Sequence, residues 1–232
     1  MILCNAFCGV SSHVPSYGAY LPCPMGMGMM LAIYTVESGN EKPVRCVMAR
    51  TLTVTRDQVP EQLRAAFDAE TAGSGGTIVG GPGSVMIHSP EMRHRANALV
   101  NYLRDESSLS KKIQELVMIL TARAMDCQYI WHAHAARARQ QGISDAFVDA
   151  LRDNKPLPAL PADEQIVVNY VQELFKTHKT SPATFQAALT QFGALGVTEL
   201  TTLMGYYALL AFNANAFEID VPAGGPEPNM PI

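Results

Sequence analysis

The sequence predicts an all-α fold, and three observations support this prediction. From Arg50 onward, apolar residues recur at helical spacing between well-marked start and stop signals. No alternation of apolar and polar residues long enough for a strand follows Thr55. The chain has 232 residues, of which 48% are hydrophobic and 16% are charged. It can therefore form a hydrophobic core without the support of disulfide bonds or a structural metal.

The composition excludes several classes of function. The net charge is −4, and 17 basic residues are scattered among 21 acidic ones, which argues against a nucleic-acid partner. No run of eighteen apolar residues suggests a membrane span. We therefore expect a soluble, cytoplasmic protein with a small-molecule substrate and no contact with nucleic acid or membrane.

The first 47 residues differ in composition from the rest. Residues 1–36 contain no charged side chain, and no basic residue precedes Lys42, so neither a secretory signal nor a transit peptide is indicated. Four of the five cysteines lie in this segment, at spacings that fit neither a zinc site nor a regular disulfide framework. We expect residues 1–47 to be a poorly structured or arm-like extension, with the helical domain over residues 48–232 and an alternative natural start at Met48.

Start and stop residues predict the helices in order. Pro60 opens a first helix, and the glycine-rich segment 73–83 follows as a loop that could act as a flap over a site. Ser89 and Pro90 begin a helix through Leu103. Further helices are expected over residues 144–151, 163–178, 181–193 and 198–213.

Two helices at the centre of the chain are joined at Asp126. Ser108 or Ser110 caps the first, which runs to about Met125, and Asp126 is predicted to be the N-cap of the second, over residues 127–141. A faint internal repeat involves the first of these helices, because Glu115-Leu116 and Glu199-Leu200 both begin apolar helices 84 residues apart (199 − 115). Two related helical hairpins would explain this repeat.

This central pair carries the densest chemistry. Glu115 has apolar neighbours at i+3 and i+4, so its carboxyl group is expected to have a raised pKa. Cys127, Ile130, Trp131 and His134 fall on one face of the second helix, whereas His132 points elsewhere. The first turn of a helix favours a thiolate, which makes Cys127 a candidate nucleophile.

Each of these residues also has a purely structural interpretation. Glu115 could pair with Arg123, two turns further along the helix. Cys127 and Trp131 could be core residues, and His134 a hydrogen-bonded core histidine. The joint spacing of Glu115, Cys127 and His134, at offsets of 0, 12 and 19, favours function.

These residues stand in a stretch that resembles a known superfamily. The segment ELVMILTARAMDCQYIWHAHAARARQQG, with VMIHSPEMRHRANALVNYLRDESSL before it and ELTTLMGYYALLAFNANAFE after it, is similar to the carboxymuconolactone decarboxylase and alkylhydroperoxidase D superfamily. The resemblance covers roughly residues 55–221. It implies an alkylhydroperoxidase D-like all-helical fold with two related helical-hairpin halves, assembled as a homo-oligomer, which means a dimer, trimer or hexamer.

The two branches of the superfamily imply different activities. The peroxidase branch resembles E(x11)C(x2)C(x3)H, in which two cysteines cycle between dithiol and disulfide. Here Glu115, Cys127 and His134 match, but Ile130 replaces the second cysteine, so only a single-cysteine peroxidase remains as an alternative.

The decarboxylase branch often reads YEWxxH, which appears here as YIWHAH, with Ile130 in place of the acid. The resemblance therefore implies a lyase or isomerase that acts by acid/base chemistry on a small organic acid or lactone, without a cofactor or metal. His134 and Glu115 would be the acid/base pair, with Cys127 as the third catalytic candidate. The expected substrate-binding residues are His88 (from HSPE), Tyr129, Ile130, Trp131 and His132. A non-catalytic helical binding protein is the third possibility.

Overall fold

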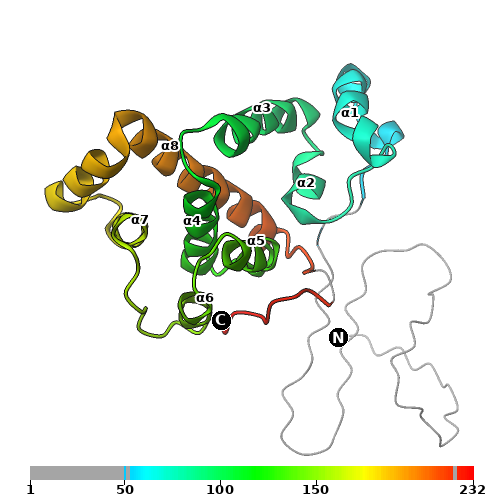
Figure 1. Ribbon diagram of the computed structural model, residues 1–232. Helices are drawn as coiled ribbons and strands as arrows, with labels where there is room; N and C mark the ends of the chain where they lie inside the picture. The colour runs from blue at the N-terminus through cyan, green and yellow to red at the C-terminus, as the bar shows by residue number, and fades with distance from the viewer. Residues whose placement is uncertain (1–49, 51–52, 222–223) are drawn as a thin grey trace, which may run out of the picture. The chain divides into compact units, whose positions relative to one another are not determined.

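The computed structural model describes residue 50, residues 53–221 and residues 224–232 (Figure 1). The prediction for residues 1–47 and the start at Met48 lie outside the described residues. In the described part the chain forms α-helices and short 3₁₀ or π turns, and it contains no strand. The all-α prediction is confirmed. The helices are α1 (Arg64–Thr71), α2 (Gly81–Met86), α3 (Pro90–Asn101), α4 (Lys111–Ala124), α5 (Gln128–Gln140), α6 (Asp145–Arg152), α7 (Ala162–Thr177) and α8 (Pro182–Ala216).

Helix α4 is the centre of the domain. Its side chains are buried on most of its circumference, and α5, α7 and α8 pack against it (Figure 1). Ser110 caps this helix, since its hydroxyl accepts a hydrogen bond from the backbone N–H of Ile113 at 3.3 Å. Of the two predicted caps, Ser110 is therefore the correct one.

The turn between α4 and α5 differs from the prediction by one residue. Asp126 has a left-handed backbone, with φ of 48°, and the N-cap of α5 is Cys127. Asp126 pairs instead with Arg123, and the N–H of Cys127 donates to the carbonyl of Ala122 at 2.8 Å. This tight turn leads directly into α5, which packs against α4.

The two helices predicted before and after Gly193 form one element, α8, with a kink. Gly193 has φ of 67° and ψ of 176°, a conformation that is essentially restricted to glycine. By length and composition alone α8 could cross a membrane, but half of its most apolar window is buried inside the domain. The kink and the burial are typical of a core helix in a folded domain, and the cytoplasmic location stays a prediction.

The loop in the glycine-rich segment 73–83 is shorter than predicted, because α2 begins within it. Residues 81–83 form the first turn of α2 rather than loop, and Gly80 and Gly81 enter that turn with φ of 74° and 67°. The helix predicted from Pro60 begins as a 3₁₀ turn, Glu61–Leu63, and continues as α1. Helix α3 ends in a π-helical turn, Tyr102–Glu106, of the kind often found at functional sites.

The described C-terminal residues pack along α5. Gln128 and Met230 exchange two hydrogen bonds, from Nε2 to the carbonyl at 2.6 Å and from the backbone N–H to Oε1 at 3.0 Å. Arg139 pairs with the buried Glu227 at 2.9 Å. This segment therefore covers one face of α5 and leaves another face for the site described below.

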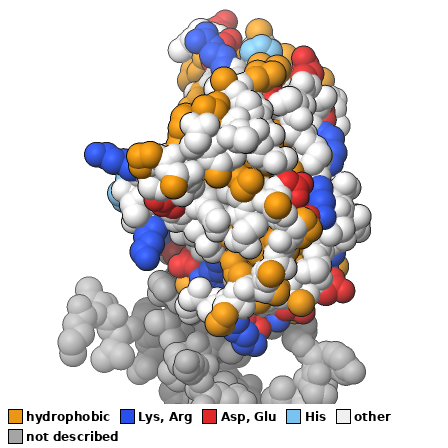
Figure 2. Space-filling model, turned by 60° about the vertical axis from the view of Figure 1, so that its left-hand side comes forward, with side chains coloured by type: hydrophobic (Ala, Val, Ile, Leu, Met, Phe, Trp, Pro, Cys, Tyr) orange, Lys and Arg blue, Asp and Glu red, His pale blue; other side chains and the backbone are white. Residues whose placement is uncertain are grey.

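Large apolar side chains remain exposed on α8. Phe185, Leu195, Leu209 and Phe212 are among them, and Leu195 and Phe212 are 60% and 65% exposed. Figure 2 shows hydrophobic side chains on one face, in patches between polar and charged ones. Association into a homo-oligomer would cover such side chains, and it stays a prediction.

Alanine substitution at two glycines of α8 tests the kink. Gly193→Ala should lower the free energy of unfolding by about 1–3 kcal/mol, because an alanine is strained at this φ and ψ. Gly205→Ala, in the regular part of the same helix with open space around it, should raise it by about 0.5–1 kcal/mol. Denaturant unfolding measures both changes. Equal effects of the two substitutions would contradict the kinked backbone.

Candidate active site

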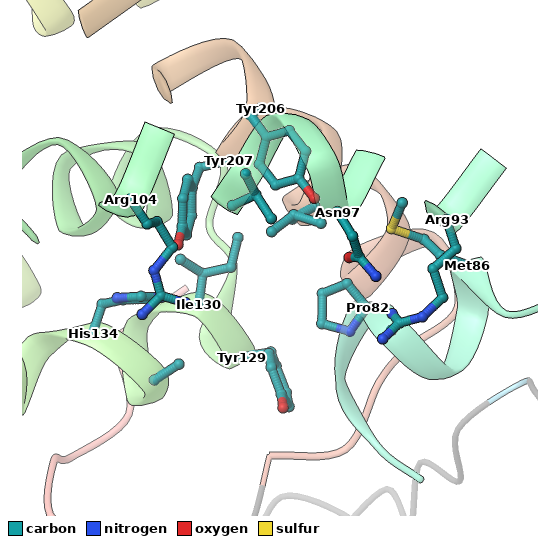
Figure 3. A pocket seen from close by; sticks show the side chains of 14 residues that line it. Pro82, Met86, Arg93, Asn97, Arg104, Tyr129, Ile130, His134, Tyr206 and Tyr207 are labelled. Atoms are coloured by element: carbon teal, nitrogen blue, oxygen red, sulfur yellow. The ribbon is translucent and has the colours of Figure 1, made fainter. Parts of the chain in front are cut away.

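A cavity of about 220 Å³ lies between α2, α3, α5, α8 and the π-helical turn (Figure 3). Its volume is that of about seven water molecules, which suits a small ligand. Arg104 and His134 lie on one side of it, and Arg93, Asn97 and Met86 lie on the other. The lining residues are Pro82, Gly83, Met86, Arg93, Asn97, Val100, Arg104, Tyr129, Ile130, Ala133, His134, Tyr206, Tyr207 and Leu210.

A hydrogen-bonded acid/base pair stands at the wall of this cavity. Nδ1 of His134, on α5, is 2.8 Å from Oε2 of Glu115, on α4. The two side chains are only 8% and 12% exposed. When Glu115 is ionised, its carboxylate can only accept a hydrogen bond, so Nδ1 would carry the proton of this bond and Nε2 would be left to exchange a proton with a bound molecule.

Tyr207 and Arg104 flank this pair. The Tyr207 ring packs edge-on against the His134 ring, with centroids 5.1 Å apart. Burial raises the pKa of the Tyr207 phenol to about 12, so its hydroxyl remains a hydrogen-bond donor throughout the neutral range. In the described part of the chain, no carboxylate lies within 4.0 Å of the Arg104 guanidinium, which is therefore available to an anion.

The opposite side of the cavity is polar but its charge is compensated. Arg93 pairs with Glu70 of α1, and Asn97 donates to the same carboxylate. Tyr206 completes this side, and burial raises the pKa of its phenol as well. In Figure 3 the hydroxyl of Tyr206 points down toward Asn97.

Tyr129 lies below the cavity, where the glycine-rich segment meets α5. A Cβ atom on Gly81 would lie 2.5 Å from the Tyr129 hydroxyl, and Gly81 also has a positive φ. Gly83 is equally confined, since its Cβ would lie 2.8 Å from Nη1 of Arg93. The glycines therefore let the backbone of α2 approach two polar side chains of the cavity, which gives this segment a role at the site.

The structure brings together four of the predicted site residues. His134, Ile130 and Tyr129 line the cavity, and Glu115 stands directly behind His134. Arg123 pairs with Asp126 rather than with Glu115, so the salt bridge considered from the sequence does not form.

Three predicted substrate-binding residues lie elsewhere. Trp131 is fully buried in the core and donates to the carbonyl of Pro228 at 3.1 Å. His132 points to the C-terminal segment, with Nε2 2.6 Å from Oδ1 of Asn229. His88 is exposed and lines a separate hollow with Val59 and Pro60. Each was predicted from the sequence pattern, which does not show what covers each helix face.

Cys127 does not have the environment predicted for a nucleophile. Its side chain is fully buried in the core and is absent from the cavity lining. Burial raises the pKa of the Cys127 thiol, although backbone N–H groups of Ile130 and Tyr129 act in the opposite direction. The cost of burying a charge exceeds the effect of the helix N-terminus here.

Five polar residues of the cavity were not predicted from the sequence: Arg93, Asn97, Arg104, Tyr206 and Tyr207. Arg93 and Asn97 are four residues apart and so share a face of α3, and the two tyrosines are adjacent in α8. These spacings are visible in the sequence, but nothing there indicates that the elements meet at one cavity. Among the residues that the structure describes, no group of three His, Cys, Asp or Glu side chains could hold a metal ion.

Comparison with known proteins supports the fold and the family. Residues 90–162 match the carboxymuconolactone decarboxylase family. No curated protein matches the sequence.

Solved structures share the fold. One is the alkylhydroperoxidase AhpD core of a peroxidase-related protein from Ralstonia eutropha, with a TM-score of 0.59 and 17% identity, over 75% of this chain and 93% of that one. Another is a peroxidase-related protein from Silicibacter, with a TM-score of 0.57 and 18% identity, over 71% and 87%. A third is a variant of the debrominase Bmp8 in complex with 2,3,4-tribromopyrrole, with a TM-score of 0.56 and 11% identity, over 76% and 95%.

Thiol alkylation tests the burial of Cys127. In a variant with serine at the other four cysteines, Cys127 should react with iodoacetamide at pH 7 at least about 100-fold more slowly than in the same protein unfolded in urea, because the thiol is inaccessible and mostly protonated. Mass spectrometry of the peptide that contains Cys127 follows the reaction. Rapid alkylation of the folded protein would contradict the buried position.

Proposed function

We propose that the chain, whose residues 90–162 match the carboxymuconolactone decarboxylase family, is an acid/base lyase or isomerase acting on a small organic acid or lactone. The observation that carries the proposal is the Glu115–His134 hydrogen bond at the wall of a small, partly apolar cavity. A buried histidine oriented by a carboxylate is suited to take up and return a proton.

The residues around the pair suit a reaction through an enolate. The Arg104 guanidinium, free of protein carboxylates in the described structure, can hold a substrate carboxylate. His134 Nε2 then takes a proton from the carbon next to a carbonyl, and the electron pair of the C–H bond moves to the carbonyl oxygen. Glu115 stabilises the imidazolium that results, and the Tyr207 hydroxyl can donate to the developing oxyanion.

The proton returns from His134 to the same or a neighbouring carbon. Loss of carbon dioxide from a substrate leads to the same type of enolate, and a His134 that already carries a proton on Nε2 as an imidazolium can protonate it. Met86, Val100, Ile130 and Leu210 form the apolar part of the wall around this intermediate. These steps need no cofactor.

The environment of Cys127 favours acid/base chemistry over the peroxidase alternative. A peroxidatic cysteine must meet the peroxide as a thiolate, whereas this thiol is fully buried and its pKa is raised. The cavity instead presents a histidine, two arginines and three tyrosines to a ligand.

Hydrogen exchange tests this proposal without knowledge of the natural substrate. In D₂O, the protein should catalyse exchange or isomerisation at carbon next to a carbonyl in members of a panel of small 3-oxo acids and lactone acids, followed by ¹H NMR. His134→Ala should lower the rate by about 10²–10⁴-fold, because the general base is lost. Glu115→Gln should lower it less, because the imidazole remains.

His132→Gln is the matched control, since His132 is on the same helix but faces Asn229 outside the cavity. It should keep the full rate. Undiminished activity of His134→Ala would refute the proposal. Binding of panel members without any exchange or release of carbon dioxide would support the non-catalytic binding protein instead. Loss of a hydroperoxide reductase activity in Cys127→Ser would favour the peroxidase.

A further inference from the structure

The two sides of the cavity differ in net charge, and Glu70 causes the difference. We propose that Glu70 makes the Arg93 side select an uncharged hydrogen-bonding group, so that the substrate is a small monocarboxylate with a neutral polar group at its other end. This inference rests on the proposed function only in taking the bound molecule to be a small organic acid.

Glu70 lies outside the cavity lining but contacts two residues that belong to it. Its Oε2 atom is 3.2 Å from Nε of Arg93, close enough to pair the charges although not aligned for a hydrogen bond. The same oxygen accepts a hydrogen bond from Nδ2 of Asn97 at 2.6 Å. Oε1 faces Nδ1 of His94 at 2.9 Å. With its side chain only 9% exposed, Glu70 is poorly screened by water.

This carboxylate changes what the Arg93 side can bind. The negative charge of Glu70 compensates the positive charge of Arg93, so a second substrate carboxylate would gain little from Arg93 and would be repelled by Glu70. Asn97 uses one N–H of its side-chain amide for Glu70, and its carbonyl oxygen can accept a hydrogen bond from a ligand. An amide oxygen accepts hydrogen bonds and disfavours a carboxylate beside it.

Tyr206 adds a group that can both donate and accept. Burial raises the pKa of its phenol, so it is neutral at physiological pH. Together, the Asn97 oxygen and the Tyr206 hydroxyl match an amide or a hydroxyl group better than an anion.

The His134 side has the opposite character. Arg104 and Arg137 lie close enough to the Tyr207 phenol for their positive charges to lower its pKa, whereas the negative charge of Glu115 raises it. Glu115 is engaged with His134, whereas Arg104 has no carboxylate partner within 4.0 Å in the described chain. One carboxylate of the ligand is therefore expected at Arg104.

This layout bears on the reaction. A substrate whose one carboxylate is held by Arg104 does not readily lose it, because the guanidinium stabilises the ionised group. The favoured step is loss of a proton to His134, with the electron pair of the C–H bond forming the enolate, and return of that proton at another carbon. This is an isomerisation, and it is balanced without a co-reactant.

Binding of two matched ligand pairs tests the proposal. Each pair differs only in an amide against a carboxylate: succinamate against succinate, and 4-carbamoylbenzoate against terephthalate. By titration calorimetry at pH 7, the wild-type protein should bind the amide acid of at least one pair roughly tenfold more tightly than the diacid. In Glu70→Gln the ratio of the two affinities, amide acid to diacid, should fall to about one or invert, because the positive charge of Arg93 is no longer compensated by a carboxylate. Arg104→Met should weaken both members of a pair.

Glu91→Gln is the matched control, since Glu91 is an exposed acidic residue on α3 whose ion-pair partner in the described structure is Arg95. It should leave the ratio unchanged. A purely structural effect of Glu70→Gln would weaken both ligands equally and also leave the ratio unchanged, which would overturn the assignment. Measurements on the wild-type protein alone could also overturn the assignment, if the protein preferred the diacids or bound none of the four ligands.

The binding ratios are also measured in His134→Ala. A preserved ratio in that variant, together with undiminished exchange activity, would refute the proposed function and leave the charge selection standing. If the wild-type protein bound the amide acid and the diacid equally well but kept its His134-dependent exchange activity, the charge selection would be refuted and the proposed function would stand.

Discussion

Burial of α4 on most of its surface is the constraint on which the rest of the structure depends. Leu116, Val117 and Ile119 are completely inaccessible to solvent, and α5, α7 and α8 obtain their apolar contacts from this helix. An acidic residue on such a helix needs a partner, because an unpaired buried charge is costly. Glu115 finds that partner in His134 of α5, so the packing of the core also fixes the orientation of the proposed base.

The cavity arises where elements distant in sequence meet beside this pair. Helix α5 supplies an apolar and an aromatic wall, α8 supplies two neutral phenols, and α3 with its π-helical turn supplies two guanidinium groups. The charges are not equivalent, because Glu70 compensates Arg93 whereas no carboxylate of the described residues lies within 4.0 Å of the Arg104 guanidinium. A small cavity with one uncompensated cation beside a buried base accounts for both the proposed reaction and the proposed choice of ligand.

The sequence predicted the helices because periodicity and capping residues act locally. The Glu115–His134 pair was expected from the resemblance to the superfamily, and the structure places the two side chains within hydrogen-bond distance. The prediction failed for site residues whose environment depends on tertiary packing. Cys127 and Trp131 share the helix face of His134 by spacing, but they are core residues, and residues 226–232 cover Trp131 through the carbonyl of Pro228. Arg104 and Glu70 escaped notice because no local pattern reveals that the π-helical turn and α1 reach this site.

The tautomer of His134 tests the central claim most directly. Long-range ¹H–¹⁵N correlation spectra of protein with labelled histidine report which ring nitrogen carries the proton in the neutral form. The account predicts Nδ1–H for His134, held by Glu115, and a change in the His134 ring shifts in Glu115→Gln. A neutral His134 protonated at Nε2, with shifts unaffected by Glu115→Gln, would contradict it.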